Sequence, residues 1–161
     1  MKDLIQKIRN QTGAGIMDIK EALEAAGGDE EAAKKELADK GKAMVEKRAG
    51  RVAGEGWIGS YVHQNGKIAA LVKLACETDF VARNSDFREL AHDLAMHVAA
   101  SDPWYVRSDE VPEGEEVGAE RILLSQAFIK DSSKTIQDLV EAATAKIGEK
   151  IEIAGFSRME I

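Results

Sequence analysis

The feature of the sequence that most constrains its fold is a predicted β-hairpin in the middle of the chain. Asn65-Gly66 is the strongest short signal for such a turn, because both residues tolerate the positive φ angles that the turn requires. Two runs rich in apolar and β-branched residues, 57–63 and 67–74, flank it. Since an isolated hairpin is at best marginally stable in water, further strands or helices must cover one of its faces.

One face of the predicted hairpin carries the apolar side chains that would form a core. Alternate residues of a strand point to the same side of a sheet, and the second run alternates in this way. We predict that Ile58 and Val62 of the first run oppose these side chains. The alternating residues of the second run are Ile68, Ala70, Val72 and Leu74.

Helical periodicity precedes and follows the hairpin. Residues 1–41 have the pattern of three short helices, the last of which we predict to end at Gly41. After the hairpin, apolar residues at helical spacing predict a long helix over residues 85–100, and Ile151 and Ile153 alternate as in a strand. These elements predict an α+β fold, with an N-terminal helical module followed by a small antiparallel sheet packed with helices.

The charge distribution indicates where the two parts meet. Residues 1–55 carry 11 basic and 11 acidic side chains, whereas residues 56–161 carry 11 basic and 18 acidic side chains. We therefore predict a helical domain over residues 1–41, a linker helix over 42–55 and an α+β core domain over 56–161.

Composition excludes several classes of protein. The net charge of −7 argues against binding to nucleic acid through phosphate contacts, which needs clustered cations. A single cysteine rules out an internal disulfide. No apolar run approaches the ~20 residues of a membrane span, and the first residues lack the apolar core of a signal peptide. We expect a cytoplasmic protein that contacts neither membranes nor nucleic acid directly.

Residues that could carry out catalysis are few. A metal-dependent enzyme could use His92, Asp93, His97 and Cys76, but among these only Asp93 and His97 have the i, i+4 spacing of a helical ligand pair. A structural zinc site needs a larger set of ligands. Cys76 ends an apolar strand, where an inert buried thiol is usual. We expect neither an enzyme nor a metal or cofactor site, and keep the metal-dependent enzyme as an alternative hypothesis.

The segment at residues 76–84, Cys-Glu-Thr-Asp-Phe-Val-Ala-Arg-Asn, joins a predicted strand to a predicted helix. Such connections are normally exposed, yet this one places two large apolar residues side by side. One interpretation is that Phe80 folds back into the core while Asp79 caps a helical turn. The other is that Phe80 is an anchor presented to a partner beside the Asp79 carboxylate. The residues alone leave both interpretations open.

Three stretches of the chain carry a resemblance to a known family. They are residues 9–18, Arg-Asn-Gln-Thr-Gly-Ala-Gly-Ile-Met-Asp, residues 76–84, and residues 145–151, Ala-Lys-Ile-Gly-Glu-Lys-Ile. In order and approximate spacing the chain resembles the bacterial translation elongation factor Ts family. The resemblance implies a ubiquitin-associated-like (UBA-like) domain of three helices at the N terminus and a core built on a three-stranded sheet.

The resemblance also implies a function and the residues that carry it. Members of this family are guanine nucleotide exchange factors that bind the GDP form of elongation factor Tu and promote loss of GDP. Arg9, Ile16 and Met17 match positions that contact the nucleotide-binding domain of the partner, and His63 resembles a histidine that faces a second partner domain in longer relatives. The segment that dislodges Mg²⁺ from the partner, with the aromatic ring as a wedge, is matched by Thr78, Asp79, Phe80 and Val81.

The resemblance leads to two further expectations, and one alternative function stands beside it. Longer members carry an additional stretch that this chain lacks near residues 119–124, so we expect a shortened core. Short members tend to form dimers through sheet edges, which leaves a homodimer open here. The alternative function is a generic adaptor that binds polypeptides through residues 1–41 and is indifferent to Asp79 and Phe80.

Overall fold

The computed structural model describes residues 1–161, and the chain divides into two compact units. The N-terminal unit combines Met1–Arg51 with Val140–Lys150, and the sheet unit combines Val52–Leu139 with Ile151–Ile161. Residues 140–150, which we assigned to the core domain, therefore group with the N-terminal helices. The other predicted domain limits stay a prediction.

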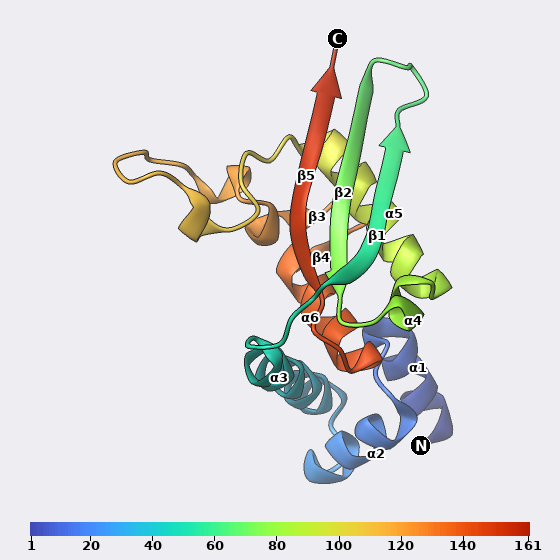
Figure 1. Cartoon of the computed structure of the whole chain (residues 1–161). Helices are drawn as coiled ribbons and strands as arrows, with labels where there is room; N and C mark the ends of the chain where they lie inside the picture. Colours follow the sequence, from blue (N-terminus) through green and yellow to red (C-terminus); the bar gives the residue numbers. More distant parts are fainter. The chain divides into compact units, whose positions relative to one another are not determined.

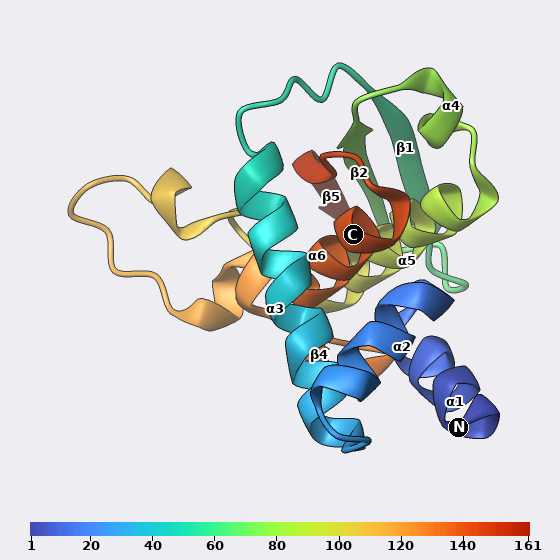
Figure 2. The ribbon, with the colours of Figure 1, turned by 90° about the horizontal axis from the view of Figure 1, so that it is seen from below.

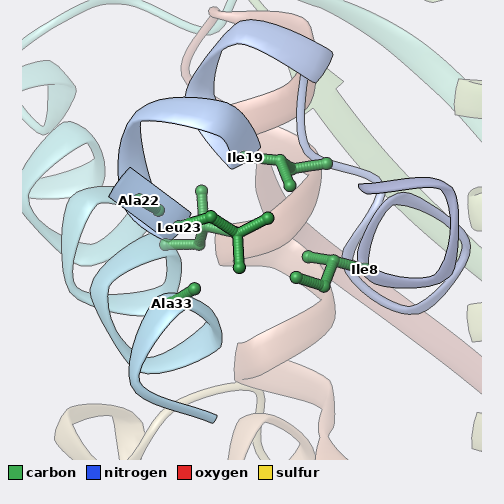
Figure 3. Packing of buried hydrophobic residues seen from close by; sticks show 6 residues of the cluster. Ile8, Ile19, Ala22, Leu23 and Ala33 are labelled. Atoms are coloured by element: carbon green, nitrogen blue, oxygen red, sulfur yellow. The ribbon is translucent and has the colours of Figure 1, made fainter. Parts of the chain in front are cut away.

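Three helices enclose the core of the N-terminal unit: α1 (Lys2–Thr12), α2 (Ile16–Ala25) and α3 (Glu30–Arg48). Gly13 ends α1, because its φ of 71° lies in the left-handed region that glycine adopts without strain. Asp29 begins α3 by accepting a 2.7 Å hydrogen bond from the backbone N–H of Ala32. The buried side chains between the helices (Figure 3) are Ile8, Ile19, Ala22, Leu23, Ala33 and Leu37.

The predicted end of the third helix at Gly41 is wrong. Helix α3 continues to Arg48, so residues 42–48 are its last turns and not a separate linker helix. Glycine weakens a helix, but Gly41 is buried, and a Cβ atom there would lie 3.7 Å from the Cβ atom of Ala145. Gly41 therefore lies against the C-terminal part of α6 (Ile136–Ile147), at a distance where a methyl group would make an ordinary van der Waals contact.

The sheet unit is built on three antiparallel strands in the order β1 (Glu55–Val62), β2 (Ile68–Cys76) and β5 (Glu152–Glu160). The β1–β2 connection contains Gly66 at a φ of 68°, so the predicted hairpin is confirmed. Helix α5 (Ser85–Ser101) packs along one face of the sheet (Figure 1). Together with the three N-terminal helices, this arrangement confirms the predicted α+β fold.

The register of the hairpin corrects the predicted core face. Ile58 pairs with the exposed Lys73, and Val62 lies on the same side of β1, so both side chains point away from α5. They are 53% and 68% exposed. Alternation shows which residues share a face, but apolar side chains on both faces leave open which face meets the core. The β1 residues that pair with the buried side of β2 are Trp57, Gly59 and Tyr61.

Gly59 allows α5 to approach the sheet closely. A Cβ atom at this position would lie 2.0 Å from the carbonyl oxygen of Ala91 and 2.9 Å from its Cβ atom. Both distances are too short for real atoms, so the native packing requires glycine here. Ala91 is fully buried at this contact. The backbones of β1 and α5 therefore meet with no side chain of β1 between them.

The chain between α5 and α6 forms mostly short elements. Residues 104–106 form a loop held by one bridge, from Tyr105 to Ile122, and residues 107–120 form a loop with short 3₁₀ turns. Strands β3 (Ala127–Phe128) and β4 (Asp131–Thr135) then pair as a second, small sheet. None of the helices of this chain combines the length and apolar character needed to cross a membrane.

A buried polar network fixes this region to α5. His97 is fully buried, and its Nδ1 atom accepts a 3.3 Å hydrogen bond from the backbone N–H of Ile129. Its Nε2 atom therefore carries the proton and donates to Oε1 of Gln126 at 2.9 Å. Burial lowers the pKa of His97, and the hydrogen bond to Gln126 opposes that shift without cancelling it.

We predict that Gly59→Ala destabilises the protein by about 1–3 kcal/mol, because the added methyl group forces β1 and α5 apart. Urea unfolding followed by circular dichroism measures the change. Gly155→Ala is the matched control, since this glycine lies in β5 of the same sheet and has no atom within 4 Å of its Cβ position. The close-approach argument is wrong if the two variants are equally stable.

We predict that His97 makes the protein less stable as the pH falls below about 6.5, the ordinary histidine pKa. Its pKa is lowered in the folded state, so below that pH the unfolded chain binds more protons and the free energy of unfolding falls. One such group contributes a slope of at most about 1.4 kcal/mol per pH unit. Urea unfolding at several pH values should show a shallower slope in His97→Gln. An unchanged slope would contradict the burial of a neutral imidazole.

Candidate functional site

The connection at residues 76–84 lies at the end of the sheet opposite the hairpin turn. It contains a single helical turn, α4 (Asp79–Ala82), between the end of β2 and the start of α5. This turn lies beside β1, as Figures 1 and 2 show from two directions. Its side chains are therefore positioned by the strands on one side and by α5 on the other.

Hydrogen bonds to backbone groups shape this connection. Oγ1 of Thr78 accepts a 3.4 Å hydrogen bond from the N–H of Val81, which makes Thr78 the N-cap of α4. The thiol of Cys76 donates to the carbonyl oxygen of Thr78 at 3.2 Å. Asn84 then caps the first turn of α5. The capping role that one interpretation gave to Asp79 thus belongs to Thr78.

Phe80 is exposed, whereas the two residues that follow it are buried. The Phe80 side chain is 85% exposed, and Val81 and Ala82 are only 7% and 3% exposed. Successive residues of a helix point about 100° apart. Because Val81 and Ala82 point into the interior, the Phe80 side chain points toward solvent. The ring forgoes about 1.5–3 kcal/mol of burial energy in this position. This is the geometry of an aromatic side chain presented at a surface, and not that of a core residue.

An ion pair flanks the exposed ring. The carboxylate of Asp79 lies 2.8 Å from the guanidinium of Arg83, one helical turn later. Both side chains are more than half exposed, so this pair contributes little to stability. In the structure the Asp79 carboxylate therefore lies toward Arg83, which follows Phe80 by three residues.

Sequence reasoning missed two residues that support this connection. The guanidinium of Arg88 lies 3.8 Å from the centre of the Trp57 ring, and its Nε atom is 3.5 Å from the carbonyl oxygen of Ala82. Arg88 belongs to α5 and Trp57 to β1. No spacing in the sequence links them, because the contact exists only once α5 lies on the sheet.

Three further predicted contact residues, Arg9, Ile16 and Met17, occupy the N-terminal unit. Arg9 lies exposed in the last turn of α1, and Ile16 and Met17 begin α2. Ile16 and Met17 are 50% and 65% exposed, although Ile19 in the same helix is fully buried. The start of α2 therefore offers apolar side chains to solvent.

His63 follows β1 and is partly buried. Its Nδ1 atom lies 2.9 Å from the hydroxyl oxygen of Tyr61, so a hydrogen bond restrains the ring at the end of the hairpin. The structure leaves its predicted role as a partner contact untested.

The residues of the alternative metal-dependent enzyme are not brought together. His97 is committed to Gln126 and Ile129, Asp93 pairs with Lys130 at 3.0 Å, and His92 lies 2.9 Å from the Ser60 carbonyl oxygen. No group of three or more histidine, cysteine and acidic residues in this chain is arranged to hold a metal ion.

Comparison with known proteins gives the same family for nearly the whole chain. A family model described as "Elongation factor TS" matches residues 1–117. Elongation factor Ts of Syntrophomonas wolfei is 42% identical over 190 aligned positions, which cover 99% of this chain and 89% of the relative. Elongation factor Ts of Thermotoga petrophila is 44% identical over 188 positions, which cover 99% of this chain and 94% of the relative.

The lengths of these alignments bear on the expected shortening. They run over 188 to 190 positions, more than the 161 residues of this chain, so each relative has residues without a counterpart here. The position of the missing stretch near residues 119–124 stays a prediction. The match over the N-terminal helices, the hairpin and the 76–84 connection shows that the chain belongs to the elongation factor Ts family.

Proposed function

We propose that this chain is a guanine nucleotide exchange factor for elongation factor Tu, and that it acts on the GDP form. Membership of the elongation factor Ts family supports the partner. The observation that carries the mechanism is the 85% exposure of Phe80 on a turn whose other apolar residues are buried. In this proposal the wedge segment, residues 78–81, enters the nucleotide-binding domain of the partner and displaces Mg²⁺ from the bound GDP.

The proposed mechanism requires packing and not covalent chemistry. Mg²⁺ neutralises charge on the β-phosphate, so GDP is held partly through the cation. A hydrophobic ring cannot ligate the metal, but it can shift packed helices between discrete arrangements and move the groups that hold the metal. Loss of Mg²⁺ then weakens GDP binding. By thermodynamic linkage, bound GDP weakens the binding of the exchange factor by the same ratio.

The N-terminal unit supplies the second proposed contact. Arg9, Ile16 and Met17 would bind the same partner domain, and the exposure of Ile16 and Met17 is consistent with a surface that a partner covers. His63 is proposed as a contact to a second partner domain. Two contacts on one chain together bind more tightly than either contact alone, because the second forms at a high effective concentration once the first is made.

We predict that Phe80→Ala lowers kcat/KM for GDP release from elongation factor Tu by about 30-fold or more, the effect of losing an interface hot spot. Release of a fluorescent GDP analogue, followed by stopped flow with catalytic amounts of the chain, measures this. The folded chain should lose no more than about 0.5 kcal/mol of stability, because the ring is exposed.

Ile129→Ala is the matched control, since Ile129 is a 45% exposed apolar residue of the same unit outside the wedge segment. It should exchange nucleotide at the wild-type rate. Full activity of Phe80→Ala would contradict the wedge role. If Met17→Ala abolished binding while Phe80→Ala had no effect, the polypeptide-binding adaptor would be the better description.

A homodimer belongs to the same proposal, with its contact on a face of the sheet and not on the sheet edges that the resemblance implied. The sheet face away from α5 carries four exposed apolar side chains, those of Ile58, Val62, Leu71 and Met159. Their pairing across β1, β2 and β5 places them on one side of the sheet. Exposed apolar patches of this kind are typical of interaction surfaces.

We predict that the chain sediments as a dimer and that Leu71→Glu is a monomer, because a charge on the central strand would be buried in the contact. Analytical ultracentrifugation measures the mass, and Ile129→Glu is the control for an added surface charge. A monomeric wild-type chain would contradict the dimer and leave the exchange proposal unaffected.

A further inference from the structure

We propose that Arg88, stacked on Trp57, is a positioning residue for the wedge segment, an inference that rests on the proposed exchange function. Arg88 lies in the first half of α5 and Trp57 at the start of β1, while Phe80 lies on the turn between β2 and α5. Arg88 reaches both the strand and the turn. It therefore connects the exposed ring to the rigid part of the sheet unit.

The first contact of Arg88 is with the turn itself. Its Nε–H donates to the carbonyl oxygen of Ala82 over a long distance of 3.5 Å. Ala82 is the last residue of α4, where carbonyl groups have no partner within the helix. A cation at this end also interacts favourably with the negative end of the helix dipole. The side chain thus holds the C-terminal end of α4, while Thr78 caps its N-terminal end.

The second contact of Arg88 is with β1. The centre of its guanidinium group lies 3.8 Å from the centre of the Trp57 ring, well within the range of a cation–π interaction. Stacking leaves the edge of the guanidinium free to donate, so both contacts form together. Trp57 pairs with Leu74, a fully buried residue of β2, and this fixes the strand beneath the ring.

The turn needs such support because it is short. One helical turn is unstable alone, since it orders several residues for few hydrogen bonds. Three backbone hydrogen bonds close the turn: Ala82 N–H to Thr78, Arg83 N–H to Asp79 and Asn84 N–H to Val81, at 3.2, 3.1 and 2.9 Å. A turn ordered before binding avoids the entropy cost of ordering Phe80 in the complex. Loosening it should therefore weaken productive binding more than the exchange step itself.

The experiment compares Arg88→Ala, Trp57→Leu and a matched control, Arg121→Ala, in the full chain. Arg121 also stacks on a tryptophan, Trp104 at 4.8 Å, and it belongs to the same unit without contacting the turn. Hydrogen exchange of the Ala82, Arg83 and Asn84 amides, followed by NMR in the free protein, measures how often the turn opens. Stopped-flow release of a fluorescent GDP analogue from elongation factor Tu gives kcat and KM separately.

For Arg88→Ala we expect faster hydrogen exchange of the three turn amides, while the amides of β1 and β2 exchange as in the wild type. We also expect kcat/KM for GDP release to be about three- to tenfold lower, through a higher KM. A loss of this size corresponds to one cation–π contact and one weak hydrogen bond. Trp57→Leu should show a smaller loss of the same kind, and Arg121→Ala should show neither effect. Adding Arg88→Ala to Phe80→Ala should cost no further activity, because the two act through the same ring.

Three results would overturn parts of this inference in distinguishable ways. If the turn amides of Arg88→Ala exchanged hydrogen at the wild-type rate, Arg88 would not hold the turn. Loosened amides with unchanged KM and kcat would overturn the positioning role and leave the exchange function standing. If the wild-type chain itself failed to speed GDP release, the proposed function would fail. Arg88 would then have no role in nucleotide exchange, whatever the hydrogen exchange of the amides shows.

Discussion

The packing of α5 on one face of the sheet is the interaction on which the rest of the structure depends. The Gly59–Ala91 contact brings the two backbones together, and buried side chains of α5, Phe87, Leu94 and Val98, contribute about 1.5–3 kcal/mol each by leaving water. Because the 76–84 connection is joined to β2 at one end and to α5 at the other, this layer sets its position. The same one-sided packing leaves the other face of the sheet open.

The 76–84 connection combines firm anchoring with an exposed aromatic ring. Val81 and Ala82 are buried, and Thr78 and Asn84 cap the two helices. These contacts within the connection offset the conformational entropy that is lost when it becomes ordered. Phe80 is left in water, where its ring contributes nothing to the stability of this chain. In the proposed function the ring leaves water when it enters the partner, and the burial of its apolar surface then contributes to the free energy of binding.

The proposed exchange reaction is a competition between two ligands of one partner. Coupling energies between such sites are typically about 1–3 kcal/mol, and they require no general acid, base or nucleophile. Membership of the elongation factor Ts family agrees with a chain that presents apolar side chains in two units, Ile16 and Met17 in one and Phe80 in the other. Each set lies on a helix that is anchored by other, buried apolar residues: Ile19, Ala22 and Leu23 in α2, and Val81 and Ala82 in α4.

Local patterns in the sequence determined the elements and the location of the candidate site. Asn65-Gly66 predicted the hairpin, and apolar spacing predicted the helix that runs from Ser85 to Ser101. The segment around Phe80 stood out because a strand-to-helix connection carries two adjacent apolar residues, but its role as a candidate site came from the family resemblance. Each of these signals acts between near neighbours in the chain. Contacts between distant residues could not be predicted in this way.

The tertiary structure decided which face of β1 meets the core, because Ile58 and Trp57 are both apolar and only the approach of α5 at Gly59 distinguishes their faces. It also decided that α3 continues through Gly41, which is buried beside Ala145, and that Phe80 is exposed while Val81 is buried. The physical reason is common to all three. Burial depends on which surfaces meet in space, and such contacts join residues that are far apart in the chain.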